Sequence, residues 1–241
     1  MIQIVPVEGL PEITEGMDIA ELVADSHELE DDDVVVIAQK AVSKAEGRVV
    51  RLDDVEPSPF ARQLAGDDGD ARQLEVILRE AKRIVRARQS FVIAETRQGF
   101  ICASAGVDAS NTPGDGTVVL LPEDADASAA RIRERLGELT GRRVGVIVSD
   151  SFGRPWRQGT IDVAIGVAGI PALLDLRGTS DARGYELRST QIAVADELAS
   201  AAELVMGKSS QIPAAVIRGL RLEGRGSAAD IPIPEDRDLF R

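Results

Sequence analysis

The sequence of 241 residues has one cysteine, one histidine and few aromatic side chains. A single cysteine, Cys102, excludes an intramolecular disulfide and a cysteine-based metal cluster, and its apolar neighbours indicate a buried side chain. A single histidine, His27, excludes a histidine-centred metal site, and its polar, acid-rich surroundings indicate a surface position. Aromatic residues make up only 3%, so the core must be built from Val, Ile, Leu and Ala.

The chain also lacks a basic and apolar leader, and no apolar run approaches the length that spans a membrane. We therefore expect a cytoplasmic protein with no membrane partner. Acidic residues outnumber basic residues by 41 to 28, and the net charge of -13 disfavours binding to nucleic acid. Any phosphate that the protein binds must be held by locally gathered Arg and Lys side chains.

Hydrophobic periodicity predicts a mixture of helices and strands within one globular unit. The predicted strands are 2–7, 34–39, 91–95, 99–103, 117–121, 144–148, 161–169 and 214–217. The predicted helices are 18–24, 72–88, 126–141 and 191–206. We expect a polar loop at 173–185 and a surface tail from Gly219 onward. No linker divides the chain, so we expect residues 1–241 to form one catalytic unit, with two interleaved subdomains as the alternative.

One stretch, residues 144–159, combines a buried strand with an unusual set of polar residues. The strand 144–148 leads to Asp150 and Ser151, which we expect where the strand meets a loop. Arg154, Arg157 and the only tryptophan follow closely. Oxygen ligands beside fixed cations suit a metal-bound phosphate. The alternative is a strand, a turn and a buried tryptophan packed under an arginine.

Three further segments each allow a functional and a purely structural interpretation. Lys44 follows the strand 34–39 and could meet phosphate, although a short helix with exposed lysines and a Gly47 cap is the simpler interpretation of the segment. Asp108 and Asn111 lie in a loop rich in turn formers, where they could offer oxygen to a divalent cation and an amide to a nucleotide, or only bond their own backbone. Lys208 follows Gly207 at a helix exit, which could be a phosphate contact or an ordinary cap.

The opening turn that contains Gly9 allows a similar choice, because its backbone N–H groups could cradle a phosphate or merely reverse the chain. Taken together, two separated aspartates fit a divalent metal and scattered lysines fit a triphosphate. A lone histidine is a poor general base, and no serine or cysteine triad is present. The chemistry is therefore expected to be phosphate-driven.

The central motif Ser149-Asp-Ser-Phe-Gly-Arg-Pro-Trp-Arg-Gln-Gly159 resembles that of the coenzyme F-420-0 gamma-glutamyl ligase family. The segments 8–11, 39–48 and 106–111 extend the resemblance over nearly the whole chain, in the stand-alone form of the family. The resemblance implies an α+β (mixed α/β) fold with largely antiparallel sheets and flanking helices, and a homodimer.

The resemblance also implies an activity and its ligands. The enzyme would use GTP to phosphorylate the phospholactyl carboxylate of F-420-0, and L-glutamate would displace the phosphate to form an amide, with a second, gamma-linked glutamate to follow. The implied cations are two divalent ions, Mg or Mn, together with K. Asp108 and Asp150 would bind the first divalent ion and Ser151 the second, where relatives often have Thr, with Gln211 as a further metal neighbour.

The residues implied around GTP come from four segments. They are Gly9, Leu10, Pro11, Glu12, Gln39, Lys44, Asn111, Met206, Gly207, Lys208, Ser209 and Ser210. Arg154 and Arg157 are assigned to substrate or phosphate anions on charge alone. Two other functions remain open from the residues: a metal-dependent nucleotide phosphohydrolase, and a non-catalytic nucleotide- or deazaflavin-binding module.

Overall fold

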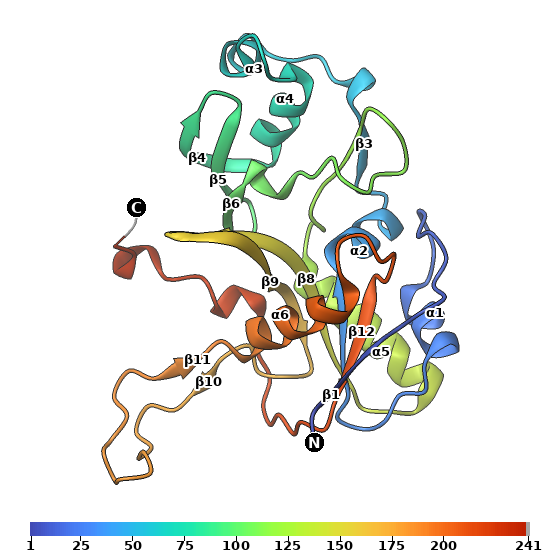
Figure 1. The fold of residues 1–241 in the computed structure, drawn as a ribbon, viewed down its shortest axis with the longest axis vertical. Coiled ribbons are helices and arrows are strands. Elements are labelled where there is room, and N and C mark those ends of the chain that lie inside the picture. Colours follow the sequence, from blue (N-terminus) through green and yellow to red (C-terminus); the bar gives the residue numbers. More distant parts are fainter. Residues whose placement is uncertain (240–241) are drawn as a thin grey trace.

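The computed structural model describes residues 1–239, which form a larger and a smaller lobe (Figure 1). The larger lobe contains the beginning and the end of the chain, and the smaller lobe is formed by residues between α2 and α5. The last two residues of the predicted surface tail, 240 and 241, lie outside the described part.

The larger lobe is built on a five-stranded sheet with the order β1-β12-β2-β8-β9. Its strands are β1 (Gln3–Pro6), β12 (Ala214–Arg218), β2 (Val34–Ala38), β8 (Gly145–Arg154) and β9 (Arg157–Ala168). All neighbouring pairs are antiparallel except β2 and β8, which run parallel. The predicted α+β fold with largely antiparallel sheets is therefore confirmed.

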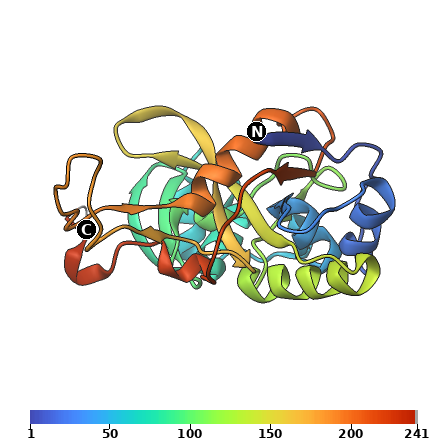
Figure 2. The same ribbon diagram turned by 90° about the horizontal axis from the view of Figure 1, so that it is seen from below.

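Helices cover both faces of this sheet (Figure 2). Those on one face are α1 (Ile19–Ser26), α2 (Gln39–Ala45) and α5 (Ala125–Thr140). The helix α6 (Val194–Met206) covers the other face. The two layers between sheet and helices are filled mainly by Val, Ile, Leu and Ala, as the scarcity of aromatic residues predicts. Polar caps define helix ends; Asp124, for example, accepts a hydrogen bond from the backbone N–H of Ala127 at the start of α5.

The smaller lobe has a separate hydrophobic core. It contains α3 (Pro59–Ala65), α4 (Ala71–Glu80), β4 (Ala81–Arg88), β5 (Phe91–Thr96) and β6 (Ile101–Ala103). The predicted hairpin of 91–95 and 99–103 is confirmed, because β5 pairs with β6 in antiparallel fashion. The short strands β3 (Val49–Arg51) and β7 (Thr117–Val119) pair where the chain enters and leaves this lobe.

The predicted helix 72–88 is wrong in its second half, where β4 replaces it. The β4 strand pairs with β5 through two register irregularities, which break the usual alternation of buried and exposed residues. The apolar spacing of β4 therefore imitates that of a helix. Strand pairing is reinforced by Lys82 and Arg83, which bind the buried carboxylate of Glu95 at 2.7 and 2.6 Å.

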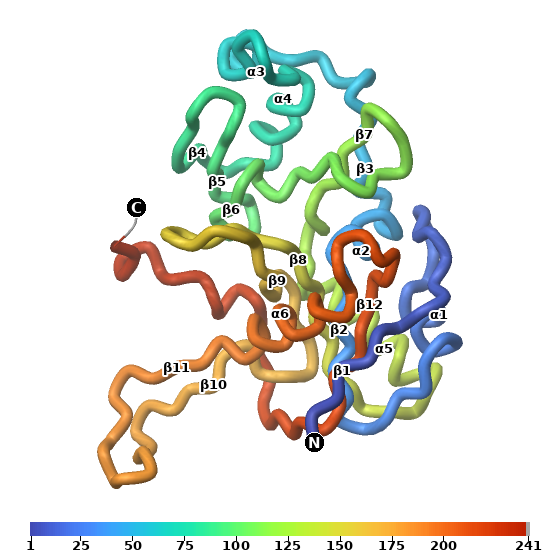
Figure 3. The backbone as a smooth tube through the Cα atoms, in the orientation of Figure 1, coloured from blue at the N-terminus to red at the C-terminus, as the bar shows by residue number. Residues whose placement is uncertain are grey.

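The predicted helix 191–206 also starts too early. Residues Gln191–Ile192 form β11, which pairs with β10 (Leu174–Asp175), and α6 begins at Val194. The exposed chain between β10 and β11 extends away from the larger lobe as an arm (Figure 3). The predicted surface tail is not entirely exposed, since Ala228 is fully buried in the hydrophobic layer between the central sheet and α6.

Two single-residue expectations differ in outcome. Cys102 is buried, as predicted. His27 is half-buried and not fully on the surface. Among residues 1–239, no helix combines the length and apolar character that crossing a membrane requires.

Candidate functional site

The site begins where β8 extends beyond its neighbour β2. The last pair between these strands is Ala38 with Ser149, so Asp150 and Ser151 lie on an edge of β8 that β2 does not cover. They were expected at the end of a strand, and that expectation is wrong, because β8 continues to Arg154. Pairing with β9 extends it: Phe152 still faces Ile161 across the ladder.

The hairpin that joins β8 and β9 also corrects the interpretation of the tryptophan. Trp156 lies in the turn with a φ of 57° and is 82% exposed, so it is not a buried residue. Arg157 is exposed as well. Arg154 is half-buried, and its Nη1 atom is buried without a hydrogen-bond partner.

Alternation along β8 directs its polar residues to opposite faces of the sheet. Asp150 shares a face with Phe152 and Val163, which pack against the core on the α5 side. Ser151 faces the α6 side together with its ladder partner Asp162. Both faces are accessible at the uncovered edge of β8.

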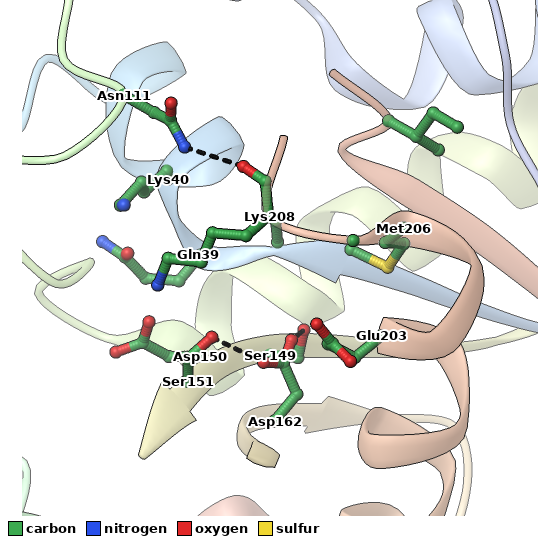
Figure 4. Close-up of a pocket in the computed structure, with 13 residues that line it drawn as sticks. Gln39, Lys40, Asn111, Ser149, Asp150, Ser151, Asp162, Glu203, Met206 and Lys208 are labelled. Atoms are coloured by element: carbon green, nitrogen blue, oxygen red, sulfur yellow. Dashed lines mark hydrogen bonds between the residues drawn. The ribbon is translucent and has the colours of Figure 1, made fainter. Parts of the chain in front are cut away.

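A cavity of about 100 Å³ lies at this edge (Figure 4). It is bounded by the junction of β2 and α2, by β8 and β9, by the end of α6 and by the loop that contains Asn111. Its lining residues are Ala38, Gln39, Lys40, Asn111, Ser149, Asp150, Ser151, Asp162, Glu203, Met206, Gly207, Lys208 and Ile212.

Asp108 lies next to the cavity through an ion pair with Lys40. The Lys40 Nζ atom is 2.7 Å from Asp108 Oδ2 and also donates a hydrogen bond to Ser110 Oγ at 2.7 Å. Asp108 Oδ1 accepts a hydrogen bond from the Ser110 backbone N–H. Burial alone would raise the pKa of Asp108, but the hydrogen bonds from Lys40 and Ser110 outweigh it and lower the pKa. Asp108 is thus held in its ionised form.

Asp150 has the opposite electrostatic surroundings. Burial raises its pKa from 3.8 to about 7, and repulsion from Asp108 and Asp162 adds to the shift. The attraction of Lys40 is a smaller, opposing effect. The charge of Asp108 contributes to the raised pKa of Asp150, so the fold brings these two residues, distant in the sequence, to the same site. A cation between such carboxylates would relieve their repulsion.

Gln39 presents a buried oxygen beside the cavity. Its side chain is 2% exposed, and Nε2 donates to Ser43 Oγ and to the Leu120 carbonyl oxygen, each at 2.7 Å. Its Oε1 atom is buried without a partner. Because an unpaired buried acceptor is costly, this oxygen marks a position where a ligand or water donor would fit.

The cavity unites seven of the predicted site residues from distant parts of the sequence: Gln39, Asn111, Asp150, Ser151, Met206, Gly207 and Lys208. Asn111 also links two loops directly, since its Nδ2 atom donates to the Lys208 carbonyl oxygen at 3.2 Å.

The other predicted residues do not line this cavity. Lys44 is buried, and its Nζ atom lies 2.5 Å from Glu12 Oε1, so the helix interpretation with exposed lysines is wrong for Lys44. The remaining members of this group are Gly9, Leu10, Pro11, Asp108, Ser209, Ser210, Gln211, Arg154 and Arg157, of which Asp108 is next to the cavity through its ion pair with Lys40.

Sequence reasoning missed four polar cavity residues: Lys40, Ser149, Asp162 and Glu203. Lys40 directly follows the predicted Gln39. Asp162 stands out as a single charge in the apolar part of β9, and the hairpin register places it opposite Ser151. Glu203 gives no local signal, because acidic residues are ordinary on a helix surface.

The chemistry of the site follows from its donor set. Within residues 1–239, no group of three or more His, Cys, Asp or Glu side chains is arranged to hold a metal on its own. Two neighbouring carboxylates, a hydroxyl and two lysines instead suit a cation whose other ligands come from an anionic substrate. This combination is typical of enzymes that act on phosphorylated compounds.

Comparisons with known proteins identify the family. The family model described as F420-0:Gamma-glutamyl ligase matches residues 9–219, and the chain belongs to this family. A coenzyme F420:L-glutamate ligase of Methanopyrus kandleri is 51% identical, over all of this chain and 98% of the relative. The protein of that name from Methanocaldococcus jannaschii is 46% identical, over 94% of this chain and 91% of the relative.

Proposed function

We propose that this protein is a GTP-dependent ligase that adds L-glutamate to coenzyme F-420-0. Its family and the names of its relatives support F420 glutamate ligation. The observation that carries the proposal is the convergence of Asp108, Asp150 and two lysines around one cavity. A GTP-dependent ligation needs such a site, because it must neutralise several phosphate charges.

The chain offers suitable residues for the cations and the nucleotide. Asp108 and Asp150 would hold a first divalent cation, Mg or Mn, and Ser151 a second with Gln211 as its neighbour. These divalent cations would screen the phosphate charges of the nucleotide, and K would add to this screening. Gln39, Asn111 and the segment 206–210 would contact GTP, together with Lys44 and the segment 9–12, once the nucleotide extends beyond the cavity.

The proposed reaction has two steps. A carboxylate oxygen of the phospholactyl group attacks the γ-phosphorus of GTP, the bond from that phosphorus to the bridging oxygen breaks, and GDP leaves. The amine of L-glutamate then attacks the carbonyl carbon of the acyl phosphate, the carbon–oxygen bond to phosphate breaks, and the amine loses a proton. The protein would exclude water from the acyl phosphate during this exchange. A second cycle would add a gamma-linked glutamate.

Arg154 and Arg157 are proposed to bind anionic substrate groups. Their place at the end of the β8–β9 hairpin, outside the cavity, favours the remote part of the deazaflavin substrate over the phosphates that react. We also propose a homodimer, which light scattering after gel filtration would test by giving twice the mass of the 25.7 kDa chain.

Mass analysis of F-420-0 after incubation with the protein, GTP, L-glutamate and Mg or Mn tests the function. We expect a mass gain of one or two glutamyl units, and none after Asp150→Ala. Phosphate release that ignores glutamate and F-420-0 would instead indicate a phosphohydrolase. A protein that binds F-420-0 with no mass change, and binds it equally well after Asp150→Ala, would be a binding module.

A further inference from the structure

Asp162 is a buried carboxylate beneath the cavity, and the site proposed above gives it no role. Its side chain is on a floor formed by β8 and β9 and is 6% exposed. It accepts hydrogen bonds from two serines at once. Ser151 Oγ donates to Oδ1 at 2.7 Å, and Ser149 Oγ donates to Oδ2 at 3.0 Å (Figure 4).

The sheet itself sets this arrangement. Ser151 and Asp162 are direct partners in the antiparallel ladder, and Ser149 lies two residues away on the same face. A bulge leaves Ile165 unpaired next to this point, and the N–H of Ala164 donates to Asp196 on α6 at 2.9 Å. Ser200, also on α6, donates to the Asp162 carbonyl oxygen at 2.7 Å. The backbone around Asp162 is therefore fixed by its pairing with β8 and by two hydrogen bonds with α6.

The hydrogen bonds determine what Ser151 presents to the cavity. A serine hydroxyl has one proton and two lone pairs. Because Asp162 accepts the proton of Ser151, only lone pairs remain for the cavity that Ser151 lines. A cation binds lone pairs and is repelled by a hydroxyl proton. A Ser151 hydroxyl without this acceptor would rotate among several orientations.

We propose that Asp162 is a positioning residue that orients the hydroxyl of Ser151 toward a divalent cation. This inference rests on the proposed function, since it assumes a cation at Ser151. Asp162 acts through Ser151 and does not itself contact the cation. The serine pair also explains how a carboxylate can be buried here: two hydroxyl donors satisfy both of its oxygens.

Binding of Mn²⁺ alone and with GDP, followed by the electron paramagnetic resonance of free Mn²⁺, tests the proposal without a turnover assay. The wild type is expected to bind two ions, and Ser151→Ala to weaken one of them. Asp162→Val keeps a strand-forming residue but removes both acceptors. It should weaken the same ion roughly tenfold or more, the effect typical of residues that orient metal ligands. The double variant should be no weaker than Ser151→Ala alone, because both changes remove one interaction.

Asp162→Asn is the matched conservative variant, because its carbonyl oxygen can still accept the proton of Ser151. It should recover most of the affinity that Asp162→Val loses, and it also serves if the valine variant does not fold. Losses that multiply in the double variant, or an Asn variant as weak as Ser151→Ala, would show that Asp162 acts by charge and overturn the proposal. Unchanged binding in Asp162→Val would do the same. A wild type that binds fewer than two ions would refute the second cation of the proposed function, and this inference with it.

Discussion

At the scale of the single residue, Asp150 shows how the fold creates an unusual acid. Burial of its carboxyl group, together with the negative charges of Asp108 and Asp162, raises its pKa to about 7. In the unfolded chain the same group would ionise at its ordinary pKa of 3.8. Between these values the folded protein keeps a proton that the unfolded chain has lost, so a rise in pH favours unfolding.

We therefore expect Asp150 to reduce the stability of the cation-free protein as the pH rises from about 4 to 7. The shift in pKa sets an upper limit of about 4 kcal/mol for this loss. Asp150→Asn should match the wild type near pH 4 and exceed its free energy of unfolding by up to this amount at pH 8. Urea denaturation in the presence of a chelator measures the difference.

A difference between the two proteins that does not grow with pH would contradict the raised pKa. Added Mn²⁺ provides a second comparison at pH 8. It should stabilise the wild type, because the cation compensates the charge of Asp150, and should stabilise Asp150→Asn far less.

The site residues show what sequence can and cannot predict at this scale. Asp150 and Ser151 were identifiable because polar residues interrupt an otherwise apolar strand. Asp162 was missed because its importance depends on the hairpin register. The alternative of a buried tryptophan was wrong because Trp156 lies exposed in the hairpin turn. The cavity position of Glu203 depends on how α6 packs, which its own segment does not encode.

At the scale of the element, the contact between α5 and β9 depends on a missing side chain. A Cβ atom at Gly166 would lie 2.2 Å from the Ala125 backbone oxygen at the start of α5. The helix is fixed here, since Asp126 accepts a hydrogen bond from the Val167 N–H at 2.7 Å. Gly166→Ala should therefore cost about 1–3 kcal/mol of unfolding free energy.

Gly153→Ala is the matched control for this prediction, because a Cβ atom at Gly153 would meet nothing within 4 Å. Denaturation by urea should place it within about 0.5 kcal/mol of the wild type. Equal stability of the two alanine variants would show that α5 can move away from the sheet at little cost.

A second element-scale prediction concerns the ion pair that joins β12 to the start of β2. Arg218 binds both carboxylate oxygens of Asp33, from Nε at 2.9 Å and from Nη2 at 2.7 Å, and Asp33 is 1% exposed. Arg218→Ala should cost about 3–5 kcal/mol, because it leaves a buried carboxylate without its charge partner. Arg221→Ala should change the free energy of unfolding by less than about 0.5 kcal/mol, because the Arg221 side chain is 81% exposed.

Loss of stability in Arg221→Ala equal to that in Arg218→Ala would refute the role of burial.

Most strands of the central sheet were predictable because a buried strand has a continuous apolar run, as β2 and β8 do. The strand β4 was not, since its pairing with β5 overrides a helix-like spacing.

At the scale of the whole molecule, the cavity connects parts of the chain that belong to different structural units. The loop with Asp108 and Asn111 leads back from the smaller lobe, whereas β8, β9 and α6 belong to the larger lobe. Direct links between these parts are the ion pair of Lys40 with Asp108 and the hydrogen bond of Asn111 with Lys208. No local sequence pattern could predict these links.

We expect ligands to order these connections. GTP with Mn²⁺ should slow hydrogen exchange of the backbone amides in the segments 108–116 and 207–212, because both loops would contact the same nucleotide. Exchange in the exposed arm between β10 and β11 should not change, because no residue of the arm lines the cavity. The arm is therefore an internal reference. Mass spectrometry of peptic fragments measures both. Protection of only one of the two loops would argue against a shared nucleotide site.

The opposite orientation of Asp150 and Ser151 on β8 has a consequence for how this protein can evolve. Side chains of a strand alternate, so inserting or deleting one residue in β8 just before Asp150 would send the acid to the α6 side and the serine to the α5 side. Length changes are consequently tolerable in the arm beyond β10 but not in the ten residues of β8. Divergence among such enzymes should proceed there by substitution alone.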